Sequence, residues 1–335
     1  MLRHNGLPGK RSAPPYPQRG KIAAMSDTLP LDQKLRTIGV DINPEMIAAT
    51  AALVAPLHAN TSRDGVKITR DLKYGPHERH RLDVFEPQPR AEAPRPVLLF
   101  VHGGGFTMGD KSAPGSPFYD NVGLWAVRTG LIGVTMTYRL APQFMWPSGS
   151  DDVAQAVKWV RENIAARGGD VDRVFVMGQS AGAVHVAAYV AREFGDYQGS
   201  SPRDSWRPAG AILVSGLYDT DTMERETRFR AYFGEDDAKL ENVSFLGALV
   251  GSKTPLLAVV AELDPKDFLR QFVVLLEACV RRHVKLPRVV QLTGHNHLTT
   301  VWQLNTANDT LGPELLDFIA KPRKPGASIS VVREL

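Results

Sequence analysis

A serine between two glycines marks the centre of the sequence, in the stretch Gly178-Gln-Ser-Ala-Gly182. The stretch follows the apolar run 174–177 and precedes a segment rich in small residues, which predicts a strand, a tight turn and a helix. Such a turn forces the central residue into a strained backbone conformation, and a Cβ on either glycine would collide with the opposite limb. Ser180 is then exposed as a nucleophile. The amide of Ala181 lies in the first helical turn, whose positive end favours a developing anion.

A serine hydroxyl is a weak nucleophile at neutral pH and needs a base that is itself oriented by a carboxylate. Downstream of Ser180, we expect such a base at the end of a predicted strand. The last predicted strand is followed by Gly294-His-Asn-His297. Both histidines of this segment are candidates, and His297 is favoured over His295.

Three carboxylates follow predicted strands and could orient this base. Asp264 and Glu262 both come after the run 256–260, and Asp219 comes after the run 211–215. Asp264 is favoured, and the other two stay open as alternatives. The chain order Ser180, Asp264, histidine is then the order found in hydrolases with a G-x-S-x-G serine.

A run of glycines, His102-Gly-Gly-Gly-Phe106, directly follows another predicted strand. Consecutive glycines let backbone N–H groups turn towards an incoming carbonyl oxygen, which a side chain would block. We therefore expect Gly104 and Gly105, with Ala181, to hold a tetrahedral oxyanion. A phosphate-binding loop is disfavoured because no G-K-[ST] sequence follows.

A scaffold for these residues is indicated by the alternation of strand and helix patterns. Strands are predicted at 66–74, 81–85, 97–101, 131–138, 174–177, 211–215, 256–260 and 288–292, the first two forming an antiparallel pair. Helices are predicted at 150–167, 267–283 and 313–320. This order predicts an α/β fold with a mostly parallel eight-stranded sheet, helices on both faces and the active site at the strand carboxyl ends.

The chain divides by composition into four parts. Residues 1–24 hold five basic side chains and no acidic one, and we expect a disordered tail there. Residues 25–65 carry helical patterns and are predicted to be a helical cap segment, and 66–320 form the catalytic domain. Within it, 217–253 is long for a connection and is expected to be part of a cap or pocket wall. Residues 321–335 are predicted to be a C-terminal tail.

The composition excludes several classes of protein. The formal charge is +4, but it comes from the basic tail, so the body is nearly neutral and no nucleic-acid surface is expected. The single cysteine, Cys279, excludes an internal disulfide and favours a cytoplasmic protein. No apolar run is long enough for a membrane span. No group of His, Cys and carboxylates has metal-ligand spacing, so we expect neither a metal nor a cofactor.

Together these motifs resemble the α/β-hydrolase superfamily, and within it the carboxylesterases similar to hormone-sensitive lipase. The resemblance covers about residues 66–320 and includes Tyr138-Arg-Leu-Ala-Pro142, Trp146-Pro147 and Asp151-Asp152. It implies a small helical cap and the triad of Ser180, Asp264 and His297. Three features depart from it. The segment after Asp264 lacks the family's usual second aspartate and has Lys266-Asp267 instead. Gln179 stands where that family usually has Asp, and Gly109-Asp-Lys111 is closer to the feruloyl-esterase-like and arylformamidase-like branches.

The resemblance and the motifs lead to the hypothesis of a serine carboxylesterase that hydrolyses short- to medium-chain esters through an acyl-enzyme. The alternatives are an amidase or arylformamidase on the same triad and a non-catalytic ligand receptor, which the complete triad disfavours. The expected partner is a small-molecule ester, and a homodimer is also considered. An apolar pocket is predicted to be lined by Phe106, Met108, Trp146, Leu217, Tyr218, Leu298 and Trp302.

Overall fold

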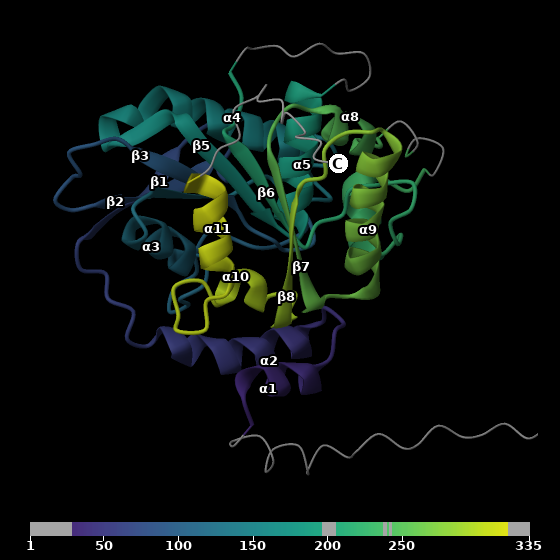
Figure 1. Ribbon diagram of the computed structural model, residues 1–335, viewed down its shortest axis with the longest axis horizontal. Coiled ribbons are helices and arrows are strands. Elements are labelled where there is room, and N and C mark those ends of the chain that lie inside the picture. Colours follow the sequence, from purple (N-terminus) through teal and green to yellow (C-terminus); the bar gives the residue numbers. More distant parts are fainter. Residues whose placement is uncertain (1–28, 196–205, 237–239, 241–242, 321–335) are drawn as a thin grey trace, which may run out of the picture.

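The computed structural model describes residues 29–195, 206–236, 240 and 243–320 (Figure 1). The predicted tails, 1–24 and 321–335, therefore lie outside the described residues. Among the helices of the described part, none is both long and apolar enough to cross a membrane.

A single twisted sheet forms the centre of the molecule (Figure 1), with the strand order β1-β2-β4-β3-β5-β6-β7-β8. From β4 to β8 all neighbours are parallel, whereas β2 pairs antiparallel with β1 and with β4. This confirms the predicted eight-stranded, mostly parallel sheet. The strands are β1 Val66–Lys73, β2 Arg81–Pro87, β3 Arg95–Val101, β4 Ile132–Met136, β5 Gly169–Gln179, β6 Gly210–Val214, β7 Leu256–Leu263 and β8 Arg288–Asn296.

Helices cover both faces of the sheet, which explains why the central strands read as continuous apolar runs. Along β3, alternate residues enter two different cores: Val97 and Leu99 pack on one face, Leu98 and Phe100 on the other. The first core includes side chains of α4 Ser148–Asn163, α5 Ala181–Phe194, α8 Leu246–Gly251 and α9 Lys266–Arg281. The second includes side chains of α2 Pro44–Val54, α3 Asp120–Arg128, α10 Thr299–Trp302 and α11 Leu311–Ala320.

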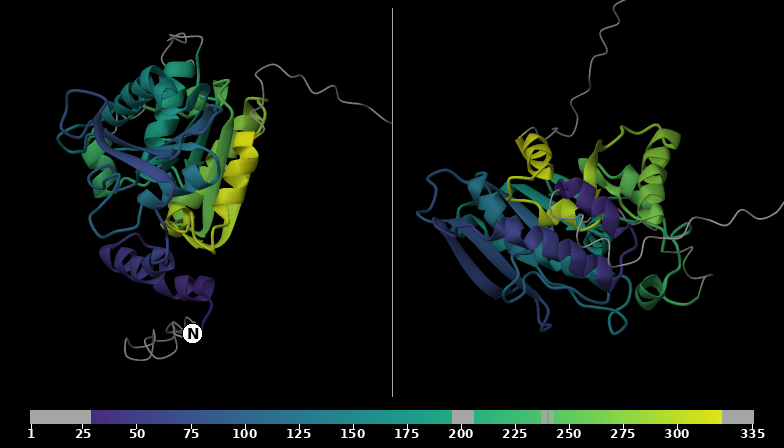
Figure 2. Two further views of the ribbon diagram at one scale, coloured as in Figure 1. Left: turned by 90° about the vertical axis from the view of Figure 1, so that its left-hand side faces the viewer. Right: turned by 90° about the horizontal axis from the view of Figure 1, so that it is seen from below.

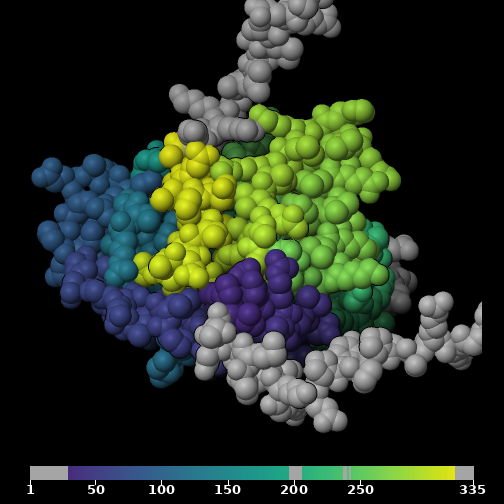
Figure 3. Space-filling model, turned by 60° about the horizontal axis from the view of Figure 1, so that its bottom comes forward, coloured from purple at the N-terminus to yellow at the C-terminus, as the bar shows by residue number. Residues whose placement is uncertain are grey.

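The N-terminal helices α1 Leu31–Ile38 and α2 lie across one end of the sheet, beside the carboxyl ends of β7 and β8 (Figures 1 and 2). Asn43 caps α2, because its Oδ1 accepts from the Met46 amide at 2.8 Å. Figure 3 shows this segment, in purple, packed directly against the yellow and green C-terminal half of the chain. Its role as a cap stays a prediction.

Arg36 and Glu262 join α1 to the sheet. The Arg36 guanidinium donates to both oxygens of the Glu262 carboxylate at 2.7 and 2.8 Å, and Glu262 also accepts from the Gly294 amide at 2.8 Å. These hydrogen bonds hold the pKa of Glu262 down, at about 2. Glu262 therefore connects α1 to Gly294, which lies shortly before the candidate catalytic residue His297.

Several boundaries differ from the sequence predictions. The helix predicted over 150–167 ends at Asn163, and a short 3-10 turn, η2 Ala165–Arg167, follows it. Strands β7 and β8 continue three and four residues beyond the predicted ends at 260 and 292. Helix α3 was not predicted, because its residues 120–127 are all buried and its sequence therefore lacks the alternation of an exposed and a buried face.

Candidate active site

Ser180 lies at the sharp turn between β5 and α5, in the backbone conformation φ 56° and ψ −124°. This is a positive φ on a residue with a Cβ, the kind of strain that the surrounding structure must hold in place. The Ser180 amide donates to the Val214 carbonyl of the neighbouring strand at 2.9 Å, and its own carbonyl accepts from the Ala183 amide. The turn is thereby fixed on both sides, with the side chain at the carboxyl end of the sheet.

The glycines on either side of Ser180 are required by close backbone packing. A Cβ on Gly178 would lie 2.2 Å from the Gly182 carbonyl oxygen, in the opposite limb of the turn. A Cβ on Gly182 would lie 2.1 Å from the Val101 carbonyl oxygen of β3. The second glycine therefore makes room for the neighbouring strand rather than for the opposite limb. Both distances are far below van der Waals contact, so neither position has space for a side chain.

His297 and Asp264 form a buried hydrogen-bonded pair behind Ser180. His297 Nδ1 donates to Asp264 Oδ1 at 2.7 Å, and both residues are at most 2% exposed. The other oxygen of Asp264 accepts from the Ser215 hydroxyl at 2.6 Å and from the Ala261 amide at 2.8 Å. The carboxylate is thus fixed by three donors, and it holds His297 with its Nδ1 protonated.

The rival side chains have other partners. Glu262 binds Arg36 and the Gly294 amide, and Asp219 accepts from the Thr222 hydroxyl at 2.9 Å. His295 Nε2 is bonded to the Thr310 hydroxyl at 2.7 Å. Among these candidates it is Asp264 and His297 that contact each other.

The turn that carries His297 is anchored to three parts of the chain. Gln179, next to the serine, donates from Nε2 to the His297 carbonyl at 3.0 Å, and the Thr300 hydroxyl donates to the same oxygen. The Asn296 side chain donates to Thr50 of α2 at 2.8 Å and accepts from two amides of its own turn. Gln179 therefore links the serine turn directly to the histidine turn. Its role was not predicted from the sequence, although its position beside Ser180 could have suggested it.

The glycine run after β3 folds back over the serine turn. Gly104 and Gly105 have φ values of 132° and 57°, and a Cβ on Gly104 would lie 2.0 Å from the Met108 carbonyl oxygen. Among the described residues, no acceptor takes a hydrogen bond from the amides of Gly104, Gly105 or Ala181. These N–H groups are therefore available to donate, and their binding of an oxyanion stays a prediction.

The His102 side chain supports this loop from within the core. The side chain is fully buried, its Nδ1 donates to the Gly103 carbonyl at 2.6 Å, and its ring stacks on Tyr138 with centroids 4.4 Å apart. The Tyr138 hydroxyl in turn donates to the His102 carbonyl at 3.0 Å. Burial lowers the pKa of His102 to about 3, so the ring is neutral and acts as a structural donor.

A cavity of about 630 Å³ opens over these groups and is lined by Ser180, His297, Ala181 and the glycine loop. Five of the predicted pocket residues also line it: Phe106, Met108, Leu217, Leu298 and Trp302. Further apolar lining residues, which the sequence did not single out, are Ile42, Ile47, Tyr119, Phe229 and Phe268. The cavity wall thus combines the N-terminal helices, the 217–253 insertion and the histidine turn.

Trp146 and Tyr218 do not line this cavity, which corrects the prediction for both. Trp146 stacks on Phe245 with centroids 5.7 Å apart and lies at 5.4 Å from Phe233, inside an aromatic cluster. Tyr218 is 1% exposed, and its hydroxyl packs beside Gly216. The half-buried Trp146 packs against aromatic residues of the insertion, and Tyr218 of the insertion is buried in the core, because aromatic surface is buried there more favourably than in the open cavity.

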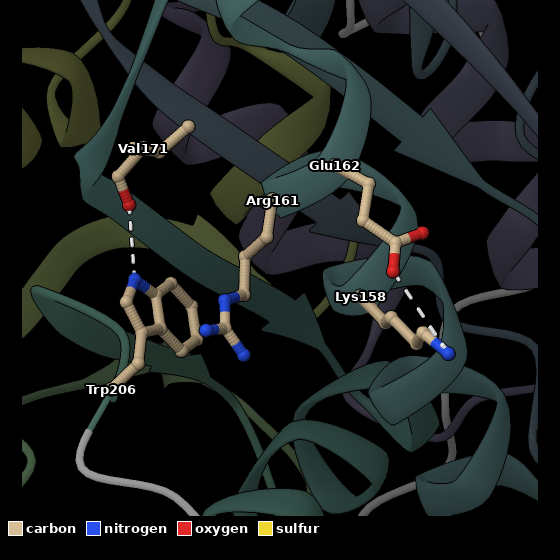
Figure 4. A pocket seen from close by; sticks show the side chains of 5 residues that line it. All are labelled: Lys158, Arg161, Glu162, Val171 and Trp206. Carbon is tan, nitrogen blue, oxygen red and sulfur yellow. Dashed lines mark hydrogen bonds and ion pairs between the residues drawn. The ribbon is translucent and has the colours of Figure 1, made fainter.

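A second hollow lies away from these groups, between α4 and the start of β5 (Figure 4). Trp206 forms its floor, donating from its indole nitrogen to the Val171 carbonyl at 3.1 Å, with Arg161 over the ring at 4.4 Å. The Lys158–Glu162 pair on its rim is exposed. It shares no lining residue with the cavity over Ser180, so we assign it no part in the chemistry of the site.

Comparison with known proteins gives matches along most of the chain. A model of the alpha/beta hydrolase fold family matches residues 98–284. Esterase LipQ of Mycobacterium tuberculosis is 39% identical over 161 residues, which are 47% of this chain and 37% of that protein. The para-nitrobenzyl esterase of Bacillus subtilis is 35% identical over 182 residues, 50% of this chain and 34% of that protein. The chain thus spans about a third of the length of these curated relatives.

Among solved structures, esterase B of Lactobacillus rhamnosis inhibited by a tributyrin phosphonate matches with a TM-score of 0.66. The sequences are 19% identical, and the match covers 87% of this chain and 94% of that one. At this identity, the likeness shows a shared fold.

Proposed function

The chain belongs to the alpha/beta hydrolase fold family, and we propose that it is a serine carboxylesterase acting on short- to medium-chain esters through an acyl-enzyme. The observation that carries the proposal is the Asp264–His297 hydrogen bond of 2.7 Å, because His297 lines the same cavity as Ser180. The esterase names of LipQ and the para-nitrobenzyl esterase support it.

The proposed reaction begins with proton transfer from Ser180 to His297. Because His297 donates from Nδ1 to Asp264, its Nε2 carries the lone pair and can accept this proton. Among the described residues Nε2 has no hydrogen-bond partner, Ser180 included, so it is available to accept the proton when substrate is bound. Ser180 Oγ attacks the ester carbonyl carbon, and the imidazolium that forms is stabilised by the buried carboxylate.

The negative charge of the tetrahedral intermediate develops on the former carbonyl oxygen. The amides of Ala181 and of the glycine loop, Gly104 and Gly105, donate to it, and loss of one such donor typically costs about 10²–10³ in rate. The intermediate then collapses, His297 protonates the leaving alcohol, and the acyl group stays on Ser180. Water, deprotonated by His297, attacks the acyl-enzyme and releases the acid by the same steps in reverse.

The cavity sets the proposed size of the acyl group. Its volume of about 630 Å³ and the apolar side chains in its wall suit a small or medium ester rather than a polymer. An amidase or arylformamidase would use the same groups, and only the leaving group would differ.

The test is a set of initial rates on p-nitrophenyl acetate, butyrate and octanoate and on an aryl formamide, for the wild type and Ser180→Ala. We expect wild-type turnover of the shorter esters and its collapse in the variant. Turnover of the formamide alone would replace the esterase proposal by the formamidase. Equal, negligible rates in both proteins would contradict an enzymatic function at this site.

A further inference from the structure

Helix α6, Thr227–Phe233, places one arginine in the cavity wall beside the glycine loop. This residue, Arg228, packs so closely on the loop that a Cβ on Gly105 would lie 2.6 Å from its Cδ and 3.3 Å from its Nη1. The absence of a side chain at Gly105 therefore gives room to the arginine. The guanidinium lies in the same cavity as Ser180, next to a proposed oxyanion donor.

Arg228 is half-buried, yet it forms no hydrogen bond or ion pair with any residue that the structure describes. Other arginines nearby are paired: Arg230, two positions along the same helix, binds Glu235 at 3.3 Å, and Arg270 binds Asp267. A guanidinium has five N–H donors, and partial burial without an acceptor is unfavourable. An acceptor for Arg228 is therefore expected to come from outside the chain.

Acidic side chains in the same wall do not supply that acceptor. Asp41, Glu224 and Glu226 are exposed, and none of them bonds to Arg228. Asp267 is buried and already accepts from the Glu224 amide at 3.0 Å and from Arg270. The exposed carboxylates are screened by solvent and salt, whereas the guanidinium lies beside the reacting groups, where a bound anion would be partly shielded from water.

We propose that the ester taken by this site carries a second, free carboxylate, as in a half-ester of a dicarboxylic acid, and that Arg228 binds it beside the glycine loop. The inference rests on the esterase function proposed above. The planar fork of a guanidinium matches a carboxylate with two parallel hydrogen bonds, which a lysine cannot reproduce. Arg228 then selects between substrates that differ only in this group.

The experiment compares esters in which a carboxylate replaces a methyl group. Monomethyl adipate and methyl hexanoate have the same chain length, and monomethyl glutarate and methyl valerate form a shorter pair. We would measure kcat/KM from methanol release for the wild type, Arg228→Met and Arg228→Lys. Arg230→Met is the matched control, because it is the same substitution on the same helix at a residue whose partner, Glu235, lies outside the cavity lining.

The quantity that tests the proposal is the ratio of kcat/KM for the half-ester to that for its neutral partner. We expect this ratio to fall about 10- to 100-fold in Arg228→Met, the effect typical of losing a charge-assisted bidentate contact, and to fall less in Arg228→Lys. Arg230→Met is expected to keep the wild-type ratio. An unchanged ratio in Arg228→Met, or an equal fall in Arg230→Met, would overturn the assignment.

Two other results separate this inference from the esterase function. If Arg228→Met slowed both members of each pair by the same factor, the arginine would act on the oxyanion or on the loop, and the carboxylate assignment would be wrong. Turnover of methyl hexanoate that is lost in Ser180→Ala would still support the esterase in that case. If no ester of either pair showed turnover dependent on Ser180, both proposals would be contradicted.

Discussion

Replacement of Asp264 by asparagine tests the geometry of the proposed base. In the wild type, Oδ2 of Asp264 accepts from two donors, the Ser215 hydroxyl and the Ala261 amide. Within the described part of the chain, Oδ1 accepts from His297 alone. An asparagine has one oxygen and one NH2 group. The oxygen will face the two donors, because an NH2 group there would meet the Ala261 N–H, and the NH2 group will face His297.

This orientation reverses the tautomer of the histidine. With an NH2 group opposite it, Nδ1 of His297 must accept, so the proton moves to Nε2, which can then no longer take a proton from Ser180. The corresponding substitution in a serine triad lowers kcat by about 10⁴, which corresponds to roughly 5.5 kcal/mol of transition-state stabilisation. We expect a loss of about 10³–10⁴ here, with a smaller change in KM.

The assay is the steady-state rate on p-nitrophenyl butyrate, with thermal unfolding to verify that the variant is folded. Asp219→Asn is the matched control, because Asp219 follows the neighbouring strand but bonds to Thr222 rather than to His297. We expect this control to retain most of its activity. If Asp264→Asn kept its rate within about tenfold while Asp219→Asn lost it, the assignment of the triad carboxylate would be refuted.

Two further predictions concern the groups that hold the site together. Gln179→Leu removes the hydrogen bond to the His297 carbonyl but keeps the volume of the buried side chain. We therefore expect kcat to fall by roughly tenfold with KM little changed. A change in KM alone would contradict a positioning role for Gln179. Glu262→Gln removes a carboxylate whose pKa is lowered to about 2 in the folded protein. A lowered folded pKa gives stability that is present above the unfolded pKa of about 4.3 and is lost as the pH falls towards 2. The Tm difference between wild type and Glu262→Gln should therefore shrink between pH 6 and pH 3, and parallel Tm curves would show that the Arg36–Glu262 contact adds no stability.

Local sequence patterns predicted the sheet and its central motif because each of them has a strong local cause. Continuous apolar runs indicate strands that are buried on both faces of the sheet. The positions of Gly178 and Gly182 must be glycine because a Cβ there would lie about 2 Å from a backbone carbonyl oxygen. The antiparallel opening pair and the parallel order from β4 onwards followed from the same patterns.

The parts that the sequence did not reveal depend on contacts between distant segments. Aromatic residues close in sequence to the site predict Trp146 and Tyr218 in the pocket, whereas Trp146 packs against Phe245 of the insertion and Tyr218 is buried. The position of Arg228 beside Gly105 and the link from Gln179 to His297 depend on pairs of residues that lie 123 and 118 positions apart in the sequence and are brought together by the fold. Among the three candidate carboxylates, sequence patterns favour Asp264 without excluding the others, and the structure places Asp264 against His297.

The most direct test of the central claim is to locate the covalent adduct formed with diethyl p-nitrophenyl phosphate, which traps an activated serine. Intact mass and peptide mapping of the inhibited protein would be followed together with the remaining activity on p-nitrophenyl butyrate. We predict one diethylphosphoryl group per chain, carried by Ser180, with activity lost in proportion to the modification and no adduct in Asp264→Asn over the same time. Full loss of activity with the adduct on another residue, or full activity with Ser180 modified, would contradict the proposed mechanism.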